Sequence, residues 1–278
     1  MAPSLSPVVG VLLAAGAGTR MGRPKALVRA ADGEPWLLRG VRTLAAGGCI
    51  TVIVVLGAEA EAAQRLLEAP ASPTDLPAAP EGTTAEPSTP PAGLTTEPST
   101  PPAGLTTAAP TPPAGLTTAA PTPPAGVTTA ASTAAAGSAA AGAAGVVCVV
   151  AEGWEEGIAA SLRAGLGAAR SVIAGDYRGG GAALAPSAVV ITLVDLPGLE
   201  AAAVRRLVEG AGPTTLRQAF YGGRPGHPVV VGVDHLDALA AAVSGDTGAR
   251  PYLMAHGAEH VDCTDLGGGD DVDTPPPA

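Results

Sequence analysis

The chain has 278 residues, 46% of them apolar, and a formal net charge of −10 at pH 7. That apolar content is ample for one sizeable core, and no apolar run is long enough to span a bilayer, so we expect a soluble protein with no membrane partner. A surface with this acidic balance lacks the clustered cations that bind a phosphate backbone, which argues against a nucleic-acid polymer as partner.

The amino-terminal segment is expected to lead directly into a strand. No Lys or Arg precedes the apolar run that starts at Val8, so the segment lacks the charged start of a secretory signal. Cys49, Cys148 and Cys263 are widely spaced and odd in number, without the CxxC spacing of a zinc site or a disulfide framework. We therefore expect a cytoplasmic protein.

Strand and helix patterns alternate along most of the chain. Apolar runs predict four buried strands, at residues 8–13, 50–56, 146–150 and 189–194. The segments between and after them predict four helices, at residues 36–46, 58–67, 156–168 and 200–209. This alternation is typical of a single doubly wound, Rossmann-like α/β domain with a mostly parallel sheet, in which ligands bind beyond the carboxyl ends of the strands.

A long insert of different composition interrupts this pattern at residues 69–145. It contains no Lys, Arg or aromatic residue, and an eleven-residue unit such as EPSTPPAGLTT recurs four times, starting at Glu86, Glu97, Ala108 and Ala119. Paired prolines favour extended polyproline conformation, and the few apolar side chains cannot offset the entropy of ordering, so we expect disorder. The repeat is either a docking site for a proline-recognising partner or a neutral expansion; the folded domain comprises residues 1–68 and 146–278.

A glycine-rich loop follows the first predicted strand and holds the only lysine of the chain. In the stretch LAAGAGTRMGRPKAL, the glycines Gly16, Gly18 and Gly22 let the backbone turn sharply and present N–H groups to an anion. Three cations, Arg20, Arg23 and Lys25, add charge that suits phosphate. The loop therefore predicts a phosphate site.

Two better-known phosphate loops do not match. A Walker loop requires a glycine directly before the lysine, but Arg23 and Pro24 separate Gly22 from Lys25. In the dinucleotide fingerprint GxGxxG, Met21 stands where the third glycine belongs.

The loop resembles the signature of the MobA-like nucleotidyltransferases, especially the molybdenum cofactor cytidylyltransferase branch. The resemblance extends to WEEGIAASLRAGL at residues 154–166, VVITLVDLP around Asp195, GRPGHPV around His227, SGDTGAR at residues 244–250 and DVDTP around Asp273. It departs from the family at residues 151–153, where an asparagine that holds the nucleotide is often found and Ala-Glu-Gly stands here.

The resemblance implies a site for nucleotidyl transfer to a phosphorylated small molecule. Arg20 and Lys25 would act on the leaving group, and Asp195 would be catalytic and hold Mg²⁺, although an aspartate at a strand end can also cap the helix that follows. Because the phosphate loop leaves the first strand and Asp195 leaves the fourth, a parallel sheet would bring both to one edge. The residues expected to bind the nucleotide are Leu13, Ala14, Ala15, Gly16, Gly18, Thr19, Gly22 and Ser161.

Several residues keep alternative interpretations. Asp273 is either a second metal ligand or part of a frayed acidic tail. His227 is a general base, a turn residue bonded to backbone, or an acceptor-binding residue, which we favour. Ser161 contacts ligand or faces a small-residue packing surface, and Trp154 is expected to pack rather than stack on a ligand. The remaining histidines, His235, His256 and His260, form no ligand spacing.

Three function classes remain. The first is a cytidylyltransferase that acts on molybdopterin or a similar acceptor. CTP is expected because the LAAG form of the loop (Leu13 to Gly16) is associated with cytidine in this family. The second is an NAD(P)H-dependent oxidoreductase, since the loop also resembles superfamily members named nicotine blue oxidoreductases. The third is a noncatalytic maturation factor that holds a cofactor for a molybdenum enzyme.

Overall fold

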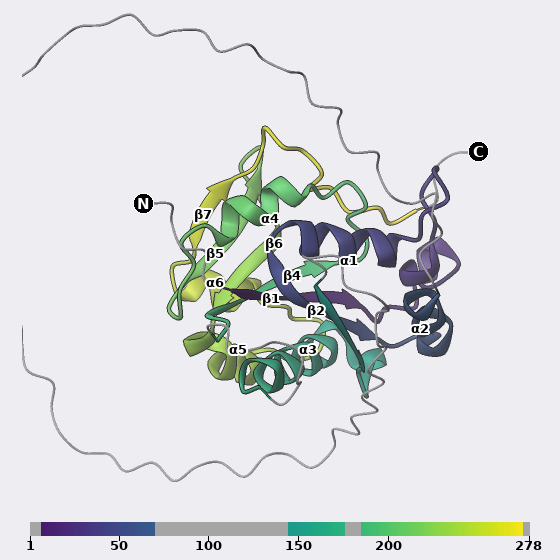
Figure 1. The fold of residues 1–278 in the computed structure, drawn as a ribbon, viewed down its shortest axis with the longest axis horizontal. Helices are drawn as coiled ribbons and strands as arrows, with labels where there is room; N and C mark the ends of the chain where they lie inside the picture. Colours follow the sequence, from purple (N-terminus) through teal and green to yellow (C-terminus); the bar gives the residue numbers. More distant parts are fainter. Residues whose placement is uncertain (1–6, 70–143, 176–184, 275–278) are drawn as a thin grey trace, which may run out of the picture. The chain divides into compact units, whose positions relative to one another are not determined.

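The computed structural model describes residues 7–69, 144–175 and 185–274 (Figure 1). Almost all of the predicted insert lies outside these ranges, so its expected disorder stays a prediction. The first described strand after the insert begins at Gly145, and the predicted domain bounds stay a prediction.

A single sheet forms the centre of the fold, with seven strands in the described part of the chain in the order β3-β2-β1-β4-β6-β5-β7. Central β1 pairs in parallel with β2 and β4, and β2 pairs in parallel with β3. Strand β6 runs antiparallel to β4 and β5, and β7 is parallel to β5. The strands span Val8–Ala14 (β1), Cys49–Leu56 (β2), Gly145–Val150 (β3), Ala188–Leu193 (β4), Leu216–Tyr221 (β5), Arg224–Gly232 (β6) and Glu259–Asp262 (β7).

Helices cover both faces of this sheet, which explains why β1 is buried along its whole length. The upper layer in Figure 1 contains α1 (Trp36–Ala46) and α4 (Ala201–Val208), and the buried side chain of α2 (Ala60–Glu68) joins the same core. The opposite layer contains α3 (Ile158–Ile173), α5 (Leu236–Ala242) and α6 (Arg250–Ala255). No helix of the described residues is both long and apolar enough to cross a membrane.

The eight predicted elements are all present, with corrections at their ends. The second predicted helix starts two residues later, because Glu59 adopts a left-handed φ of 50°. The third starts at Ile158 and continues to Ile173, since Gly157 has a φ of 124°, which is incompatible with a helix. Asp195 does follow the fourth strand, which ends at Leu193.

Three strands and two short helices of the carboxyl-terminal third were not predicted. The prolines and glycines of β6 obscure its strand pattern, and α5 and α6 have only seven and six residues. One usable signal was present: Gly222 and Gly223, both with positive φ, form the two-residue turn between β5 and β6.

Two glycines of α3 provide a matched test of how closely the helix packs on the sheet. A Cβ on Gly165 would lie 2.7 Å from Val11 Cγ1 and 3.0 Å from Val55 Cγ2, whereas a Cβ on Gly167 meets no atom within 4 Å. We expect Gly165→Ala to lower the free energy of unfolding by about 1–3 kcal/mol through overpacking. Gly167→Ala should raise it by about 0.5–1 kcal/mol, because alanine has the higher helix propensity. Urea unfolding of both variants measures the two effects, and equal shifts would contradict this packing.

Candidate active site

The glycine loop after β1 closes on itself at Gly18. Gly18 has a φ of 60°, and a Cβ there would overlap the carbonyl oxygen of Arg23, so this close approach requires glycine. Short 3-10 turns at Thr19–Met21 and Lys25–Leu27 follow, and the buried side chains of Met21 and Ala26 anchor them to the core. The loop therefore holds its cations on a defined backbone.

Four charged side chains meet beside this loop, and we call them the charged cluster: Arg20, Lys25, Asp195 and Asp273. Lys25 Nζ donates to Asp195 Oδ2 at 2.7 Å and to Asp273 Oδ1 at 2.5 Å. Arg20 Nη1 donates to Asp273 Oδ2 at 2.6 Å. Residues that are 170 and 253 positions apart in the sequence are thus joined in one network.

The strand order accounts for the meeting of Lys25 and Asp195. Strands β1 and β4 are parallel neighbours with Leu13 opposite Leu193, so the chain leaves both strands at the same edge of the sheet. The amide of Val194 donates to the carbonyl of Leu13 at 3.1 Å, which extends the pairing up to the start of the loop. The convergence that the sequence predicts is therefore present in the fold.

The carboxyl-terminal segment brings Asp273 to the same place. Val272 N donates to the carbonyl of Asp195 at 2.9 Å. Two glycines allow the close crossing: a Cβ on Gly268 would overlap the backbone of Gly198, and one on Gly269 would overlap the ring of Tyr221. Asp273 is therefore held by backbone and by two cations, and the alternative of a frayed acidic tail is wrong for this residue.

The electrostatics of the cluster leave one carboxylate oxygen unsatisfied. Burial lowers the pKa of Lys25, but hydrogen bonds and charges of Asp195 and Asp273 outweigh it, and the net pKa is raised. The hydrogen bond and charge of Lys25 lower the pKa of Asp273. Asp195 Oδ1 is buried without a hydrogen-bond partner among the described residues. A buried carboxylate oxygen of this kind, facing a second carboxylate across one ammonium, is suited to a hard divalent cation.

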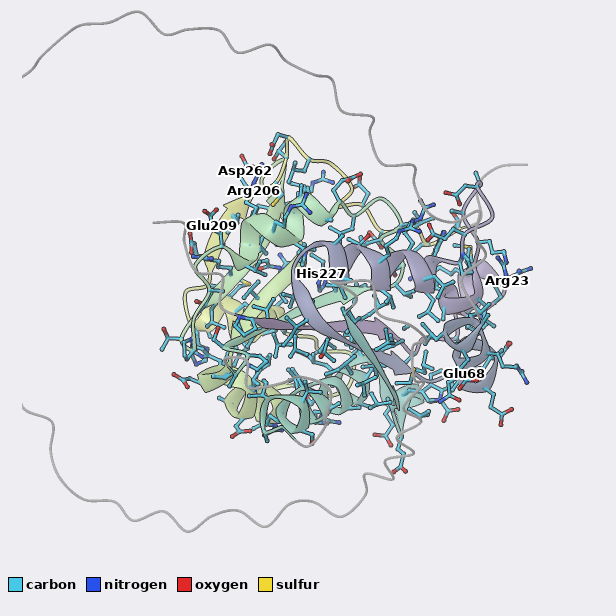
Figure 2. The ribbon with its side chains drawn as sticks, in the orientation of Figure 1. Arg23, Glu68, Arg206, Glu209, His227 and Asp262 are labelled. Carbon is cyan, nitrogen blue, oxygen red and sulfur yellow. The ribbon has the colours of Figure 1, made fainter. Side chains whose placement is uncertain are left out.

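The other predicted loop residues lie around this cluster. Leu13, Ala14 and Ala15 are buried at the end of β1, and the carbonyl of Ala15 accepts from Ala58 N at 3.0 Å. Thr19 and Gly22 are exposed at the two ends of the first 3-10 turn, and a Cβ on Gly16 would meet no atom within 4 Å. Arg23 is exposed at the outer edge, whereas His227 lies centrally (Figure 2). The nucleotide-binding roles of these residues remain predictions.

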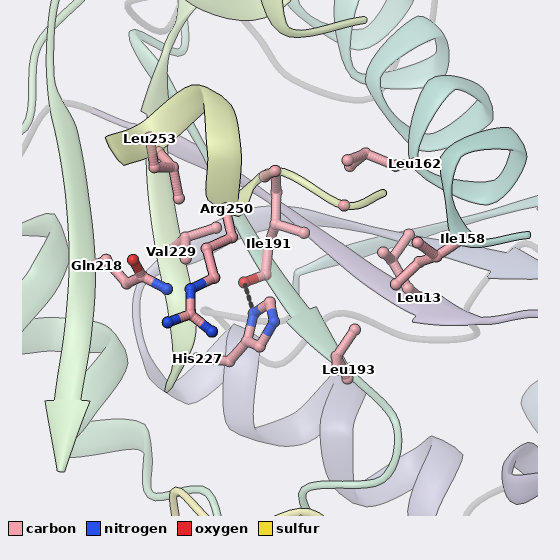
Figure 3. Close-up of a pocket in the computed structure, with 12 residues that line it drawn as sticks. Leu13, Ile158, Leu162, Ile191, Leu193, Gln218, His227, Val229, Arg250 and Leu253 are labelled. Carbon is pink, nitrogen blue, oxygen red and sulfur yellow. Dashed lines mark hydrogen bonds between the residues drawn. The ribbon is translucent and has the colours of Figure 1, made fainter. Parts of the chain in front are cut away.

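A second feature, a pocket of about 110 Å³, adjoins the same edge of the sheet on the α3 side (Figure 3). Its wall includes the ends of β1 and β4, at Leu13 and Leu193, and the first turn of α3. Its polar side chains are Gln218, His227 and Arg250. His227 is thus placed at a cavity, as the acceptor-binding interpretation requires.

The environment of His227 fixes its protonation state. Its Nδ1 lies 3.2 Å from the carbonyl oxygen of Ile191, so Nδ1 carries the proton and Nε2 is left as a hydrogen-bond acceptor. Burial lowers the pKa of His227, against the opposing effects of the Ile191 carbonyl and of the Asp195 charge. A neutral imidazole at pH 7 follows, which both hydrogen-bonds backbone and lines the pocket.

This lowered pKa predicts a pH dependence of stability. A histidine whose pKa is lower in the folded than in the unfolded protein binds fewer protons when folded, so it destabilises the fold as the pH falls. We expect wild type to lose stability as the pH falls below about 6.5, the ordinary pKa of histidine. His227→Gln should lose less over the same range in urea unfolding between about pH 7 and pH 5. Parallel pH profiles for the two proteins would contradict the lowered pKa.

The remaining candidate residues contact other parts of the protein. Ser161 is buried in the first turns of α3 and does not line the pocket, which fits the packing alternative. Trp154 packs on the same core as α3, and a Cβ on Gly57 would overlap its ring, so the packing interpretation of Trp154 is confirmed. His235 bonds Tyr252, and His260 stacks on Phe220.

Neither Gln218 nor Arg250 is predicted as a site residue from the sequence. Gln218 comes from β5, which was not predicted, so nothing placed it near His227. Arg250 ends the SGDTGAR segment, and its position as the sole charged side chain among those that line the pocket was not visible in the sequence.

Comparisons with known proteins show which family and which sequences this chain resembles. The model of the MobA-like NTP transferase domain matches residues 10–86 and 116–261. The nicotine blue oxidoreductase of Paenarthrobacter nicotinovorans is 27% identical over 277 residues, covering 96% of this chain and 92% of that protein.

Solved structures with a similar fold include proteins of two other organisms. Rv0371c of Mycobacterium tuberculosis H37Rv has a TM-score of 0.54 and 20% identity, with 98% of this chain and 95% of that chain covered. A nucleotidyl transferase from Methanothermobacter thermautotroptrophicus has a TM-score of 0.56 and 16% identity, with 96% and 92% covered. On the strength of the domain match over most of its length, the chain belongs to the MobA-like NTP transferase family.

Proposed function

We propose that this protein transfers a nucleotidyl group, CMP from CTP, to the phosphate of a small acceptor such as molybdopterin and releases pyrophosphate. One observation carries the proposal: Lys25 of the glycine loop lies between Asp195 and Asp273 at the carboxyl edge of the sheet. Nucleotidyl transfer needs a cation that contacts phosphate, and it needs nearby carboxylates that can hold a metal. The charged cluster has side chains suited to both tasks.

In the proposed reaction, an oxygen of the acceptor phosphate attacks the α-phosphorus of the nucleotide. A new P–O bond forms as the bond to the β-phosphate oxygen breaks, and the electron pair leaves with pyrophosphate. Backbone N–H groups between Ala15 and Gly18 bind the triphosphate, and Arg20 and Lys25 contact the charge that develops on the leaving group. Arg23 has no hydrogen bond or ion pair within the described residues, so it is available to a further phosphate oxygen.

Asp195 and Asp273 fit a divalent cation, and Asp195 Oδ1 is the stronger candidate ligand because it has no other partner among the described residues. Magnesium bound there would neutralise charge on the phosphate oxygens. Lys25 bridges the two carboxylates. A contact between its ammonium and a phosphate would therefore compete with these two ion pairs.

The acceptor side and the cellular setting rest on other residues of the chain. The LAAG sequence at Leu13 to Gly16 favours CTP by resemblance, and the pocket beside His227 is suited to a ring of the acceptor. A molybdenum enzyme would then be the protein that receives the product. The three cysteines are free and buried, which supports a reducing, cytoplasmic setting.

The test is an assay for pyrophosphate with each of the four ribonucleoside triphosphates, Mg²⁺ and molybdopterin. We expect release with CTP that requires both the acceptor and Mg²⁺. Release with GTP alone among the nucleotides would overturn the base assignment, and no release with any nucleotide would overturn the transferase proposal.

The relative named nicotine blue oxidoreductase favours a second candidate, an NAD(P)H-dependent oxidoreductase of that type. Loss of NAD(P)H absorbance with an aromatic quinone-type acceptor and no pyrophosphate would support it. Binding of a pterin with neither activity would indicate the noncatalytic maturation factor.

A further inference from the structure

The carboxyl-terminal residues 263–273, which we call the strap, connect the end of β7 to the charged cluster (yellow in Figure 1). Hydrogen bonds fasten the start of the strap. Cys263 N donates to the carbonyl oxygen of Phe220 at 2.8 Å. The guanidinium of Arg206 donates to both carboxylate oxygens of Asp265, at 2.5 and 2.8 Å. This end of the strap is therefore fixed to β5 and α4.

The middle of the strap, at residues 267–271, makes no hydrogen bond and no ion pair within the described part of the chain. Its sequence is GGGDD, and its first two glycines have φ of 64° and 76°. Because glycine has little conformational preference of its own, the path of this stretch depends on what it packs against. A Cβ on Gly268 would overlap the backbone of Gly198. A Cβ on Gly269 would overlap the ring of Tyr221, so these two contacts define the path.

The side chain of Tyr221 offers the strap a fixed surface. Its hydroxyl donates to the carbonyl oxygen of His227 at 2.9 Å. A Cβ on Gly226 would lie 2.9 Å from Cδ2 and 3.0 Å from Cε2 of the ring, so the ring is closely packed against β6 as well. It is half-buried and packs on the core beneath α1 and α4. Since both its hydroxyl and its edge are held, the ring determines where Gly269 can lie.

We infer that Tyr221 is a positioning residue, whose ring supports the strap and thereby keeps Asp273 against Lys25. No hydrogen bond joins Tyr221 to this ion pair in the described structure, and it acts through Gly269, four positions before Asp273. Without the ring, a cavity would open under the strap and the glycine stretch would shift into it. Asp273 would then leave Lys25, while Asp195 keeps its place after β4. The catalytic consequence rests on the proposed function, in which Asp273 is a candidate metal ligand.

Lys25 provides a local readout of the strap, because it is the sole lysine of the chain. Its side chain is 16% exposed, and its ammonium is held between two carboxylates, so an amine reagent should modify it slowly. In Tyr221→Leu we expect trinitrobenzenesulfonate to modify Lys25 about fivefold faster or more, since one of the two carboxylates is lost. Tyr221→Phe should keep the wild-type rate, because it retains the ring. Mass mapping of the modified peptide separates Lys25 from the amino terminus.

Amide hydrogen exchange distinguishes a loosened strap from a destabilised fold. Val272 N donates to the carbonyl oxygen of Asp195 at 2.9 Å, beyond the glycine stretch, whereas Cys263 N is bonded before that stretch. In Tyr221→Leu, exchange at Val272 should accelerate about tenfold or more, because its segment opens locally. Exchange at Cys263 should stay as in wild type.

Gly269→Ala tests the same contact from the side of the strap. Its added Cβ would overlap the ring and push the strap away without opening a cavity, so the modification of Lys25 should again be faster. In the transferase assay, this variant and Tyr221→Leu should each need about tenfold more Mg²⁺ for half-maximal rate, because both lose the support of a metal ligand. The KM for nucleotide should change less.

Phe220→Leu is the matched control, because Phe220 is the adjacent half-buried aromatic residue of β5 and its ring stacks on His260 of β7. Its modification and exchange rates should equal those of wild type. An unchanged modification rate in both Tyr221→Leu and Gly269→Ala, or an equal increase in Phe220→Leu, would overturn the inference. Rates that rise in the two strap variants and not in the control, in a protein that releases no pyrophosphate, would sustain the inference and refute the proposed transferase instead.

Discussion

Lys25→Ala should lower the rate of pyrophosphate release about 100-fold or more, with a smaller effect on the KM for nucleotide. Loss of a charge-assisted contact to a leaving phosphate costs about 2.7 kcal/mol or more in the transition state, which corresponds to this 100-fold decrease. The position of Lys25 supports this role, because its ammonium bridges the two acids proposed to hold magnesium. Steady-state kinetics with CTP and saturating Mg²⁺ give the measurement.

The substitution also changes the unliganded protein, and this change is a separate readout. Without Lys25, the pKa of Asp273 should rise, because the hydrogen bond and charge of Lys25 are the main causes of its lowered value. A carboxyl with a lowered pKa stabilises the fold at neutral pH, and that contribution is lost as the pH falls through about 4 and below. Wild type and Lys25→Ala should therefore differ less in stability at acid pH than at neutral pH.

Arg65→Ala controls for the loss of one positive charge and should retain full turnover, because Arg65 is exposed on α2 and has no ion pair among the described residues. Lys25→Arg should restore little activity, since the guanidinium is larger and cannot replace a compact ammonium between two carboxylates. Full turnover by Lys25→Ala would remove this residue from the mechanism.

The sequence was sufficient to predict the amino-terminal half of the fold and the meeting of its main residues. Uninterrupted apolar runs identify β1 and β4, and the rule that ligands bind beyond parallel strand ends places Lys25 beside Asp195. In this half of the chain, the local apolar pattern and the topology of the fold both predict that Lys25 and Asp195 meet. That agreement explains why residues 170 positions apart could be paired in advance.

The carboxyl-terminal third could not be predicted in the same way. The strand β6 contains two prolines and two glycines, and its antiparallel pairing with β4 depends on long-range contacts. The position of Asp273 depends on two glycines that allow the segment to cross Gly198 and Tyr221, which no periodicity reveals. Arg250 and Gln218 meet at the pocket only once β5, β6 and α6 are assembled.

Asp195→Asn should have the largest effect on activity, a decrease of about 1,000-fold or more at a fixed Mg²⁺ concentration. Asparagine keeps the size of the side chain but removes the charge that would hold the metal, and metal-based stabilisation of a phosphoryl transition state is worth several kcal/mol. Oδ1 of Asp195 is the buried oxygen that lacks a partner in the described structure, so the amide also places a donor or a weaker ligand where the cation would bind.

The dependence on Mg²⁺ separates this role from a structural one. If Asp195 holds the metal, raising Mg²⁺ should recover part of the activity of Asp195→Asn, and the variant should bind Mn²⁺ more weakly in a direct titration with CTP present. Asp271→Asn is the matched control, because Asp271 is exposed in the same segment as Asp273 and has no ion pair among the described residues. A variant Asp195→Asn that binds Mn²⁺ and turns over as well as Asp271→Asn would show that the charged cluster is an ion-pair network that only supports the fold.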